Sequence, residues 1–368
     1  KHPIHSPERM EACADYILNE FESYGLNTNV HEFDVEGFDY TFRNIEATTD
    51  GSGPELLIVS HYDTVRHAPG ADDNGTAITV MLEAARVLSK HAPKGKVRFV
   101  SFNLEELNPA RAKKILELSV ENGILDKEGR FTSSHTAKAI KKYWDLFFKY
   151  KPGTTSFSEV SERVLSELSD ELHSNEITYL KGRLQLNEGI TDLNYQEIIG
   201  LMGSNAWVRD APSRNITAKG VICLETMGYV SSQKNSQRLP EGLDANAFKI
   251  YNTEADLTIG DFLTIVADCN SGPLGEFLCT KCELDSIELP YAYLQGNFNY
   301  EQAVQIMPDI LRSDHAPFWR EGIPALMLTD SAEFRSPYYH TSADSIDKLD
   351  FDFLTKICKA VVATAIEF

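Results

Sequence analysis

The fold is decided by a stretch that begins with Leu56-Leu57-Ile58-Val59 and ends with Lys96-Val97-Arg98-Phe99-Val100-Ser101-Phe102. Its first four residues form a short apolar run, which is typical of a strand buried on both faces. Residues 76–89 place apolar side chains at helical spacing, and residues 96–102 again favour a strand. A strand, a loop, a helix and a second strand in this order indicate a βαβ unit. We therefore expect an α/β fold with a mostly parallel central sheet flanked by helices.

The sequence on both sides extends this pattern. Upstream, apolar residues at helical spacing predict a helix that starts after Ser6, its expected cap, and ends at Gly25. Two strands follow, the first over residues 30–35 and the second to about Ala47. Downstream, we expect strands at residues 220–224, 262–266 and 325–328, and an amphipathic helix from about residue 351 to the end.

Residues 109–200 interrupt the alternation of strands and helices. They are charged and helix-like over long stretches such as residues 137–150 and 160–172. A segment of roughly ninety residues is far longer than an ordinary loop, so we expect a folded, mainly helical insertion. Residues 1–108 and 201–368 would then form the α/β domain.

The charge of the chain bears on its partners. The 368 residues carry a formal net charge of −20. Nucleic acids and anionic membranes bind clustered Lys and Arg, so we expect neither as a partner. An acidic chain is compatible with a cationic ligand such as a free α-amine, although we expect most of the charge on a solvated surface.

Cysteines and apolar runs say little about the compartment. Six cysteines do not make a disulfide scaffold in a chain of this length, and Cys279-Thr280-Lys281-Cys282 is a lone pair, so we expect ordinary thiols or else a local disulfide. No apolar run reaches the ~18 residues that span a bilayer, and no signal peptide is evident. A cytoplasmic location is slightly favoured. The chain begins with Lys1 rather than Met, so a secreted or periplasmic location stays open if an upstream signal has been removed.

Acidic residues and histidines gather where the predicted strands end, which is where open α/β sheets place their sites. They are His61 and Asp63, Asp72 and Asp73, Glu105 and Glu106, Glu225, and, in later loops, Asp314, His315 and His340. Imidazole and carboxylate ligands without thiolates suit Zn²⁺, or a neighbour such as Mn²⁺ or Co²⁺. A carboxylate between two histidine-bearing half-sites can bridge two ions ~3.5–4 Å apart, and the second carboxylate of a Glu-Glu pair can act as a general base.

Each motif alone has an ordinary structural explanation. A His-x-Asp at a strand end is more often a structural pair, an Asp-Asp-Asn-Gly is usually a turn, and Glu-Glu is normally solvated. Their joint occurrence at the carboxyl ends of predicted strands favours a metal site instead.

Together, these stretches resemble the M28 family of zinc peptidases, the group of aminopeptidases related to aminopeptidase Y and the leucyl aminopeptidases. The matching stretches are residues 60–65, 69–77, 103–106, 202–204, 224–228, 313–318 and 339–344. They occur in the order of the family's motifs and cover nearly all of the chain except residues 109–200. The resemblance implies a zinc aminopeptidase-like α/β fold and a peptide or aminoacyl substrate.

The resemblance also implies a role for each matching residue. Glu106 and His340 would hold one zinc ion, and His61 and Glu225 the other. Asp72 would bridge the two ions. The peptide bond between Asp72 and Asp73 matches a family position that is often cis. Two Zn²⁺ per chain are expected, and one is the alternative.

Further roles follow from the same resemblance. Asp63 would hydrogen-bond the far nitrogen of His61. Glu105 would act as general base, taking a proton from the metal-bridged water and passing it to the leaving amine. We expect Asp73, Asp314, His315 and Tyr339 as supporting residues, with His315 hydrogen-bonded rather than a metal ligand.

Three features depart from the family pattern. Glu225 stands where many relatives carry Asp. The tyrosine that assists the oxyanion in secreted relatives has no counterpart just before Ser313, and Tyr338, Tyr339 and Arg312 are the candidates to replace it. The insertion directly follows Glu106, so it would lie over the mouth of the site as a lid, or else form the interface of a homo-oligomer.

The function expected from these observations is that of a zinc aminopeptidase acting on small peptides. A glutaminyl-cyclase-like aminoacyl transfer with one zinc and a carboxypeptidase-type M28 activity stay open. A non-catalytic binding module is disfavoured because every expected ligand is present. A serine hydrolase and a dinucleotide enzyme are disfavoured because neither a G-x-S-x-G nor a G-x-G-x-x-G motif occurs where it is needed.

Overall fold

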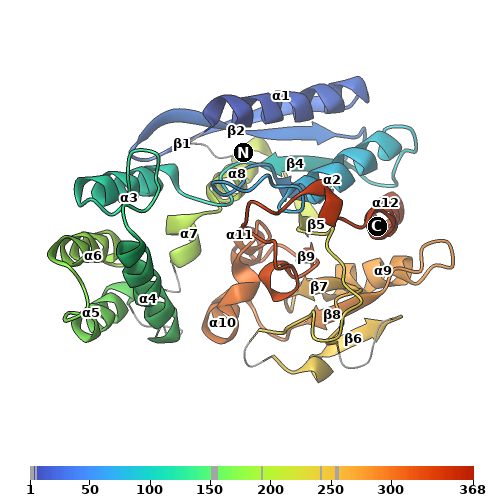
Figure 1. The fold of residues 1–368 in the computed structure, drawn as a ribbon. Helices are drawn as coiled ribbons and strands as arrows, with labels where there is room; N and C mark the ends of the chain where they lie inside the picture. The colour runs from blue at the N-terminus through green and yellow to red at the C-terminus, as the bar shows by residue number, and fades with distance from the viewer. Residues whose placement is uncertain (1–3, 5, 151–155, 192–193, 241–242, 253–256) are drawn as a thin grey trace.

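A nine-stranded mixed sheet forms the centre of the molecule (Figure 1). The structure is a computed structural model, and it describes residues 4, 6–150, 156–191, 194–240, 243–252 and 257–368. The strands lie in the order β1-β2-β4-β3-β5-β9-β7-β8-β6. They are β1 (Asn27–Val35), β2 (Phe38–Thr48), β3 (Glu55–His61), β4 (Val97–Phe102), β5 (Ala218–Glu225), β6 (Phe248–Tyr251), β7 (Leu263–Ala267), β8 (Tyr291–Gln295) and β9 (Ala325–Thr329).

The sheet is parallel at its centre and antiparallel toward its edges. Strands β4, β3, β5 and β9 are neighbours and run parallel. The pairs β1–β2, β2–β4, β9–β7 and β8–β6 are antiparallel, whereas β7–β8 is parallel. The predicted α/β class is confirmed. Strands β6 and β8 were not predicted, and they widen the sheet beyond the predicted strand near residue 262.

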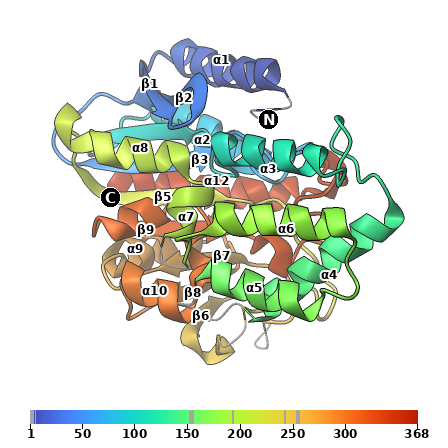
Figure 2. The same cartoon turned by 90° about the vertical axis from the view of Figure 1, so that its left-hand side faces the viewer.

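Helices cover both faces of the sheet (Figures 1 and 2). Alternate residues of β3 serve different cores: Leu56 and Ile58 pack on one face, and Leu57 and Val59 on the other. This follows from the two-residue repeat of a strand. The helices over the first face are α1 (Pro7–Ser23), α2 (Gly75–Leu88), α9 (Gly272–Cys282) and α12 (Phe351–Glu367), and those over the second are α8 (Met202–Asp210), α10 (Tyr300–Ile306) and α11 (Ala316–Arg320).

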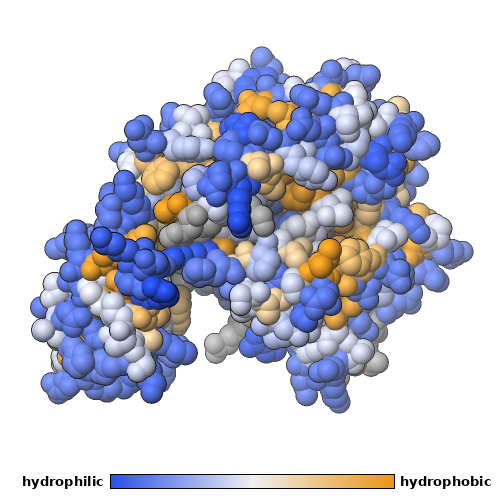
Figure 3. Space-filling model, turned by 45° about the horizontal axis from the view of Figure 1, so that its top comes forward, coloured by the Kyte–Doolittle hydropathy of each residue, from blue (hydrophilic) through white to orange (hydrophobic). Residues whose placement is uncertain are grey.

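The described residues between 109 and 199 form a helical lobe beside this body, on the left in Figure 1. Its helices are α3 (Pro109–Glu121), α4 (Ser134–Tyr150), α5 (Phe157–Glu167), α6 (Ser174–Asn187) and α7 (Tyr195–Ile199). They enclose a hydrophobic core of their own that includes Tyr143, Phe147 and Val164. A notch separates the lobe from the body in the space-filling view (Figure 3). Its role as lid or subunit interface stays a prediction.

The first and last residues of the lobe lie side by side and are connected by hydrogen bonds. The Asn108 N–H donates to Ile199 O at 2.5 Å, and the Asn108 side chain caps α3. The chain then returns along the segment after β4, where the N–H groups of Leu201 and Met202 donate to Glu105 O and Leu104 O, both at 2.9 Å. A side chain at Gly200 would collide with Glu105 O. The backbone of Glu105 is thus shared between the body and the root of the lobe.

Two further observations bear on the sequence analysis. Among the described residues, every helix is too short or too polar to cross a lipid bilayer. None of the six cysteines, all of which the structure describes, forms a disulfide, and Cys279 and Cys282 are buried in α9. Of the two states expected for this pair, the structure has free thiols.

Candidate active site

The site lies at the carboxyl ends of the central parallel strands. His61 is the last residue of β3, Glu225 is the last residue of β5, and Glu105 and Glu106 follow β4 closely. Because β3 pairs in register with both β4 and β5, these ends meet at one edge of the sheet. His340 comes from the long segment after β9. Sheet pairing therefore gathers residues that are far apart in the sequence.

Two half-sites share the carboxylate of Asp73, which lies in the turn before α2. In one half-site, His61 Nε2 lies 3.4 Å from Asp73 Oδ1 and 3.4 Å from Glu225 Oε2. In the other, His340 Nε2 lies 3.0 Å from Asp73 Oδ2 and 3.2 Å from Glu106 Oε2. Each oxygen of Asp73 thus faces a different histidine. The arrangement matches two cation sites with one bridging carboxylate.

Unpaired buried atoms indicate that these groups fit metal ions. Both ring nitrogens of His61, Asp73 Oδ1 and Glu106 Oε1 are buried without a hydrogen-bond partner. Leaving such groups unpaired costs about 1–3 kcal/mol each, and more where they are charged. A divalent cation in each half-site would satisfy them. Imidazole nitrogens and carboxylate oxygens are the donors that zinc accepts in catalytic sites.

The electrostatics of the site also favour bound cations. Burial raises the pKa of Glu105 well above its usual range. Burial and the nearby Asp73 carboxylate raise the pKa of Glu106 to about 7. Burial would also raise the pKa of Asp73, but the adjacent rings of His340 and His61 more than offset it and hold its pKa low. Four buried carboxylates around two histidines are an excess of negative charge that positive ions would balance.

The predicted bridging role of Asp72 is wrong, and Asp73 takes that position. Asp72 Oδ1 instead accepts hydrogen bonds from Gly228 N at 2.8 Å and from Thr76 Oγ1 at 3.3 Å. The carboxylate of Asp344 accepts from the backbone N–H groups of both aspartates, at 2.8 and 3.3 Å, and so fixes this turn. Adjacent side chains therefore point in different directions. The cis peptide joins Asp73 to Asn74, not Asp72 to Asp73 as predicted.

The buried carboxylate of Asp63 contacts residues of both half-sites. Its Oδ1 lies 3.5 Å from His61 Nδ1, the ring nitrogen that points away from Asp73. Its two oxygens also accept the backbone N–H groups of Glu105 and Glu106, at 3.1 and 3.2 Å. The second role was not predicted from the sequence. One buried carboxylate thus orients a histidine and the two glutamates.

The segment 313–315 lies behind Glu225. Ser313 Oγ donates to Glu225 Oε2 at 2.7 Å, an interaction that was not predicted. Asp314 is fully buried, and burial raises its pKa to about 7. His315 Nε2 donates to Ile310 O at 2.7 Å, and burial lowers the pKa of this ring to about 4. His315 lies in neither half-site, so it is a buried neutral histidine that supports the loop.

Of the three candidates for oxyanion stabilisation, Tyr339 lies at the site. Its ring stacks on His340 with centroids 3.8 Å apart. Burial and the carboxylates of Asp73 and Glu106 raise its pKa well above the usual range, so its hydroxyl stays protonated. Tyr338 instead packs edge-on against Tyr229. Arg312 forms ion pairs with Glu333 and, at 3.8 Å, with Asp309.

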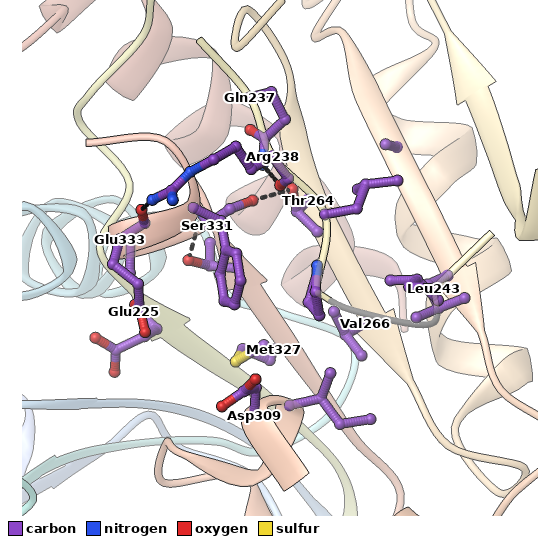
Figure 4. A pocket seen from close by; sticks show the side chains of 18 of the residues that line it. Glu225, Gln237, Arg238, Leu243, Thr264, Val266, Asp309, Met327, Ser331 and Glu333 are labelled. Carbon is purple, nitrogen blue, oxygen red and sulfur yellow. Dashed lines mark hydrogen bonds between the residues drawn. The ribbon is translucent and has the colours of Figure 1, made fainter. Parts of the chain in front are cut away.

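An apolar pocket opens beside Glu225 (Figure 4). It has a cavity volume of about 90 Å³. Tyr339 and Arg312 lie in its wall, together with the apolar residues Leu243, Phe262, Val266 and Met327. They come from β7, β9 and loops that the sequence analysis did not connect to the site. Apolar residues on β7 and β9 were the signal, but the sequence does not tell which face of these strands borders the two half-sites.

Comparison with known proteins fits this geometry. A model of peptidase family M28 matches residues 44–175 and 283–365, more than half of the chain. The chain belongs to peptidase family M28. As a member of M28, it carries both half-sites on the edge of the sheet described above.

Relatives and solved structures resemble this M28 chain to different extents. The uncharacterized protein YfbL of Escherichia coli is 23% identical over 96% of this chain and 79% of its own length. Aminopeptidase YwaD of Bacillus subtilis is 30% identical, but over only 31% of this chain and 25% of its own length. A Zn-dependent exopeptidase from Parabacteroides distasonis (16% identity, TM-score 0.52, 97% of this chain and 90% of that chain) has a similar fold. The same holds for Tannerella forsythia glutaminyl cyclase (15% identity, TM-score 0.51, 98% and 91%).

Proposed function

We propose that the protein is a zinc-dependent aminopeptidase that removes N-terminal residues with apolar side chains from small peptides. The observation that carries this proposal is the pair of half-sites that share Asp73, with Glu105 beside them. Membership in a peptidase family and the similarity to aminopeptidase YwaD support it. The alignment with YwaD covers only part of either chain, so the choice of substrate rests on the site itself.

The ligand set follows from the two half-sites. His61 and Glu225 would hold one zinc ion, His340 and Glu106 would hold the other, and Asp73 would contribute one oxygen to each. Zinc ions held by these residues would polarise a substrate carbonyl and lower the pKa of a water molecule. Ser313 keeps the Glu225 carboxylate in place through its hydrogen bond.

Glu105 is the residue that moves the proton. Its Oε2 lies 3.9 Å from His61 Nε2, so the carboxylate borders the half-site of His61 and Glu225. Burial raises its pKa, and a carboxylate with a raised pKa accepts a proton more readily and returns it as an acid. Glu105 would take a proton from the attacking water and deliver it to the leaving amine. Asp63 fixes its backbone for this step.

The surroundings favour an aminopeptidase over a carboxypeptidase. A carboxypeptidase needs a cation that is free to bind the substrate carboxylate. In the pocket wall, the guanidinium of Arg312 is paired with the carboxylates of Glu333 and Asp309. The apolar lining would instead take up an aliphatic or aromatic side chain at the N-terminus of the substrate.

Metal content and turnover together test the proposal. We expect the wild-type chain to hold two more zinc ions than the His61→Ala/His340→Ala variant, as measured by elemental analysis. On a panel of aminoacyl amides, leucine, methionine and phenylalanine should be released faster than aspartate or lysine, and chelation should abolish the release.

Two outcomes would redirect the assignment. A difference of one zinc ion, with cyclisation of N-terminal glutamine and no hydrolysis, would favour the glutaminyl-cyclase-like reaction, which the shared fold also accommodates. Release of C-terminal residues from blocked peptides would favour a carboxypeptidase.

Replacing Tyr339 by Phe should lower kcat by roughly 10²–10³-fold with little change in KM, because the hydroxyl would stabilise the oxyanion only in the transition state. Steady-state kinetics on leucine amide measure this. Tyr338→Phe is the matched control and should leave kcat within about twofold, since Tyr338 packs against Tyr229. Equal effects of the two substitutions would contradict a specific role for Tyr339.

A further inference from the structure

A second group of metal-ligand side chains lies in the helical lobe, outside the active site. His135 is in the first turn of α4, His173 directly precedes α6, and Glu176 is in the first turn of α6. One donor atom from each of the three residues lies within 4.8 Å of the other two. The group thus brings together the beginnings of the helices α4 and α6.

The spacing of these donor atoms suits a small divalent ion. His135 Nε2 lies 3.4 Å from Glu176 Oε2, and His173 Nδ1 lies 3.9 Å from Glu176 Oε1. In a tetrahedral zinc site with bonds of 2.0–2.1 Å, neighbouring donors are about 3.3 Å apart. The two imidazole rings stack with centroids 4.0 Å apart, so the two histidines are direct neighbours.

The burial of Glu176 points to a ligand. Its side chain is 0% exposed, yet Oε1 has no hydrogen-bond partner. Oε2 accepts the backbone N–H of His173 at 2.9 Å, an interaction that caps α6 and accounts for this oxygen alone. A fully buried carboxylate is rare unless it is paired or binds a metal. The helix cap therefore accounts for the burial of Oε2 but not for that of Oε1.

The histidines provide access from solvent. The side chains of His135 and His173 are 47% and 65% exposed, so both rings have room to turn their nitrogens toward a common ion. The nearby ammonium group of Lys142 is paired with Glu171 at 2.5 Å. Its charge is thus balanced locally and does not oppose a cation at Glu176.

We propose that His135, His173 and Glu176 form a zinc site that fastens the start of α4 to the start of α6. Three protein ligands leave a fourth position for water. The site is independent of the active site, because it shares no residue with either half-site. Its role is to stabilise the lobe, since an ion that binds only the folded state raises the stability of that state.

Zinc binding to the full, tag-free chain tests this proposal. After removal of metal, equilibrium dialysis against micromolar Zn²⁺ should give one zinc ion fewer for His135→Ala/His173→Ala than for the wild type. The control His91→Ala, which removes an exposed histidine outside the group, should keep the wild-type number. Zinc should also raise the Tm of a chain that carries His61→Ala/His340→Ala, and this rise should vanish when His135 and His173 are replaced as well.

A second variant separates metal binding from folding. Glu176→Gln keeps an oxygen that can accept the His173 N–H, but it removes the charge that an ion needs. It should therefore stay folded and lose the one zinc ion. Wild-type zinc content in both Glu176→Gln and the double-histidine variant would overturn the proposal, and so would an equal loss in His91→Ala.

Discussion

Replacing Glu105 by Gln should lower kcat by about 10²–10⁴-fold while the zinc content stays at the wild-type level. The amide keeps the size of the side chain but cannot accept the proton of the attacking water. The contacts of Asp73 with His61 and His340 do not involve the Glu105 side chain, so these proposed metal ligands should remain in place. Steady-state kinetics and elemental analysis on the same preparation measure both quantities.

Glu105→Asp is the informative control for this experiment. It retains a carboxylate on a shorter arm, so its kcat should lie between those of the wild type and Glu105→Gln. Turnover of Glu105→Gln within a few fold of the wild type would exclude Glu105 as the general base. Loss of zinc from this variant would instead make Glu105 a ligand.

The neighbouring aspartates should respond in opposite ways to the same substitution. Asp73→Asn should weaken zinc binding by more than about 100-fold and abolish turnover, because even residues that only support metal ligands contribute 10–100-fold to affinity. Asp72→Asn should keep its zinc ions and most of its activity. The Asp72 Oδ1 atom accepts hydrogen bonds from Gly228 N and Thr76 Oγ1, and the amide oxygen of Asn can accept the same two.

Zinc titration of the two variants, with circular dichroism to compare their folding, decides between the two aspartates. Both substitutions change one buried carboxylate in the same turn, so each serves as the control for the other. Retention of zinc by Asp73→Asn together with its loss from Asp72→Asn would restore Asp72 as the bridging residue.

The fold was predictable because the central strands carry an unmistakable signal. Residues 56–59 and 221–224 are apolar on both faces, as strands in the middle of a parallel sheet must be. Strands β6 and β8 gave no such signal. Strand β6 is only four residues long and only partly buried, and β8 follows a proline in a stretch of mixed character.

The site was predictable as far as strand ends determine it. His61, Glu106 and Glu225 sit where their strands end, so sheet pairing brings them together. The choice between Asp72 and Asp73 depends on how one turn is held by Asp344, which lies 271 residues further along the chain. The contact of Ser313 with Glu225 likewise depends on tertiary structure.

The histidines of the lobe show the same limit. His135 and His173 are 38 residues apart in a segment that reads as solvated helix, and neither carries a recognisable motif. Only the packing of α4 against its neighbours brings both rings to one carboxylate. Helical periodicity predicted that the lobe folds, but it does not specify which helix ends meet.

The meeting of Asn108 and Ile199 has a consequence for how such a chain can change over generations. Because the two ends of the lobe lie next to each other, the whole lobe can be inserted, deleted or exchanged as one unit. After a deletion, a short turn would connect the two chain ends. Such an exchange of the lobe would also affect catalysis. The backbone that follows the lobe donates a hydrogen bond to the carbonyl of Glu105. A replacement lobe that packs at a different angle would therefore displace Glu105, the proposed general base.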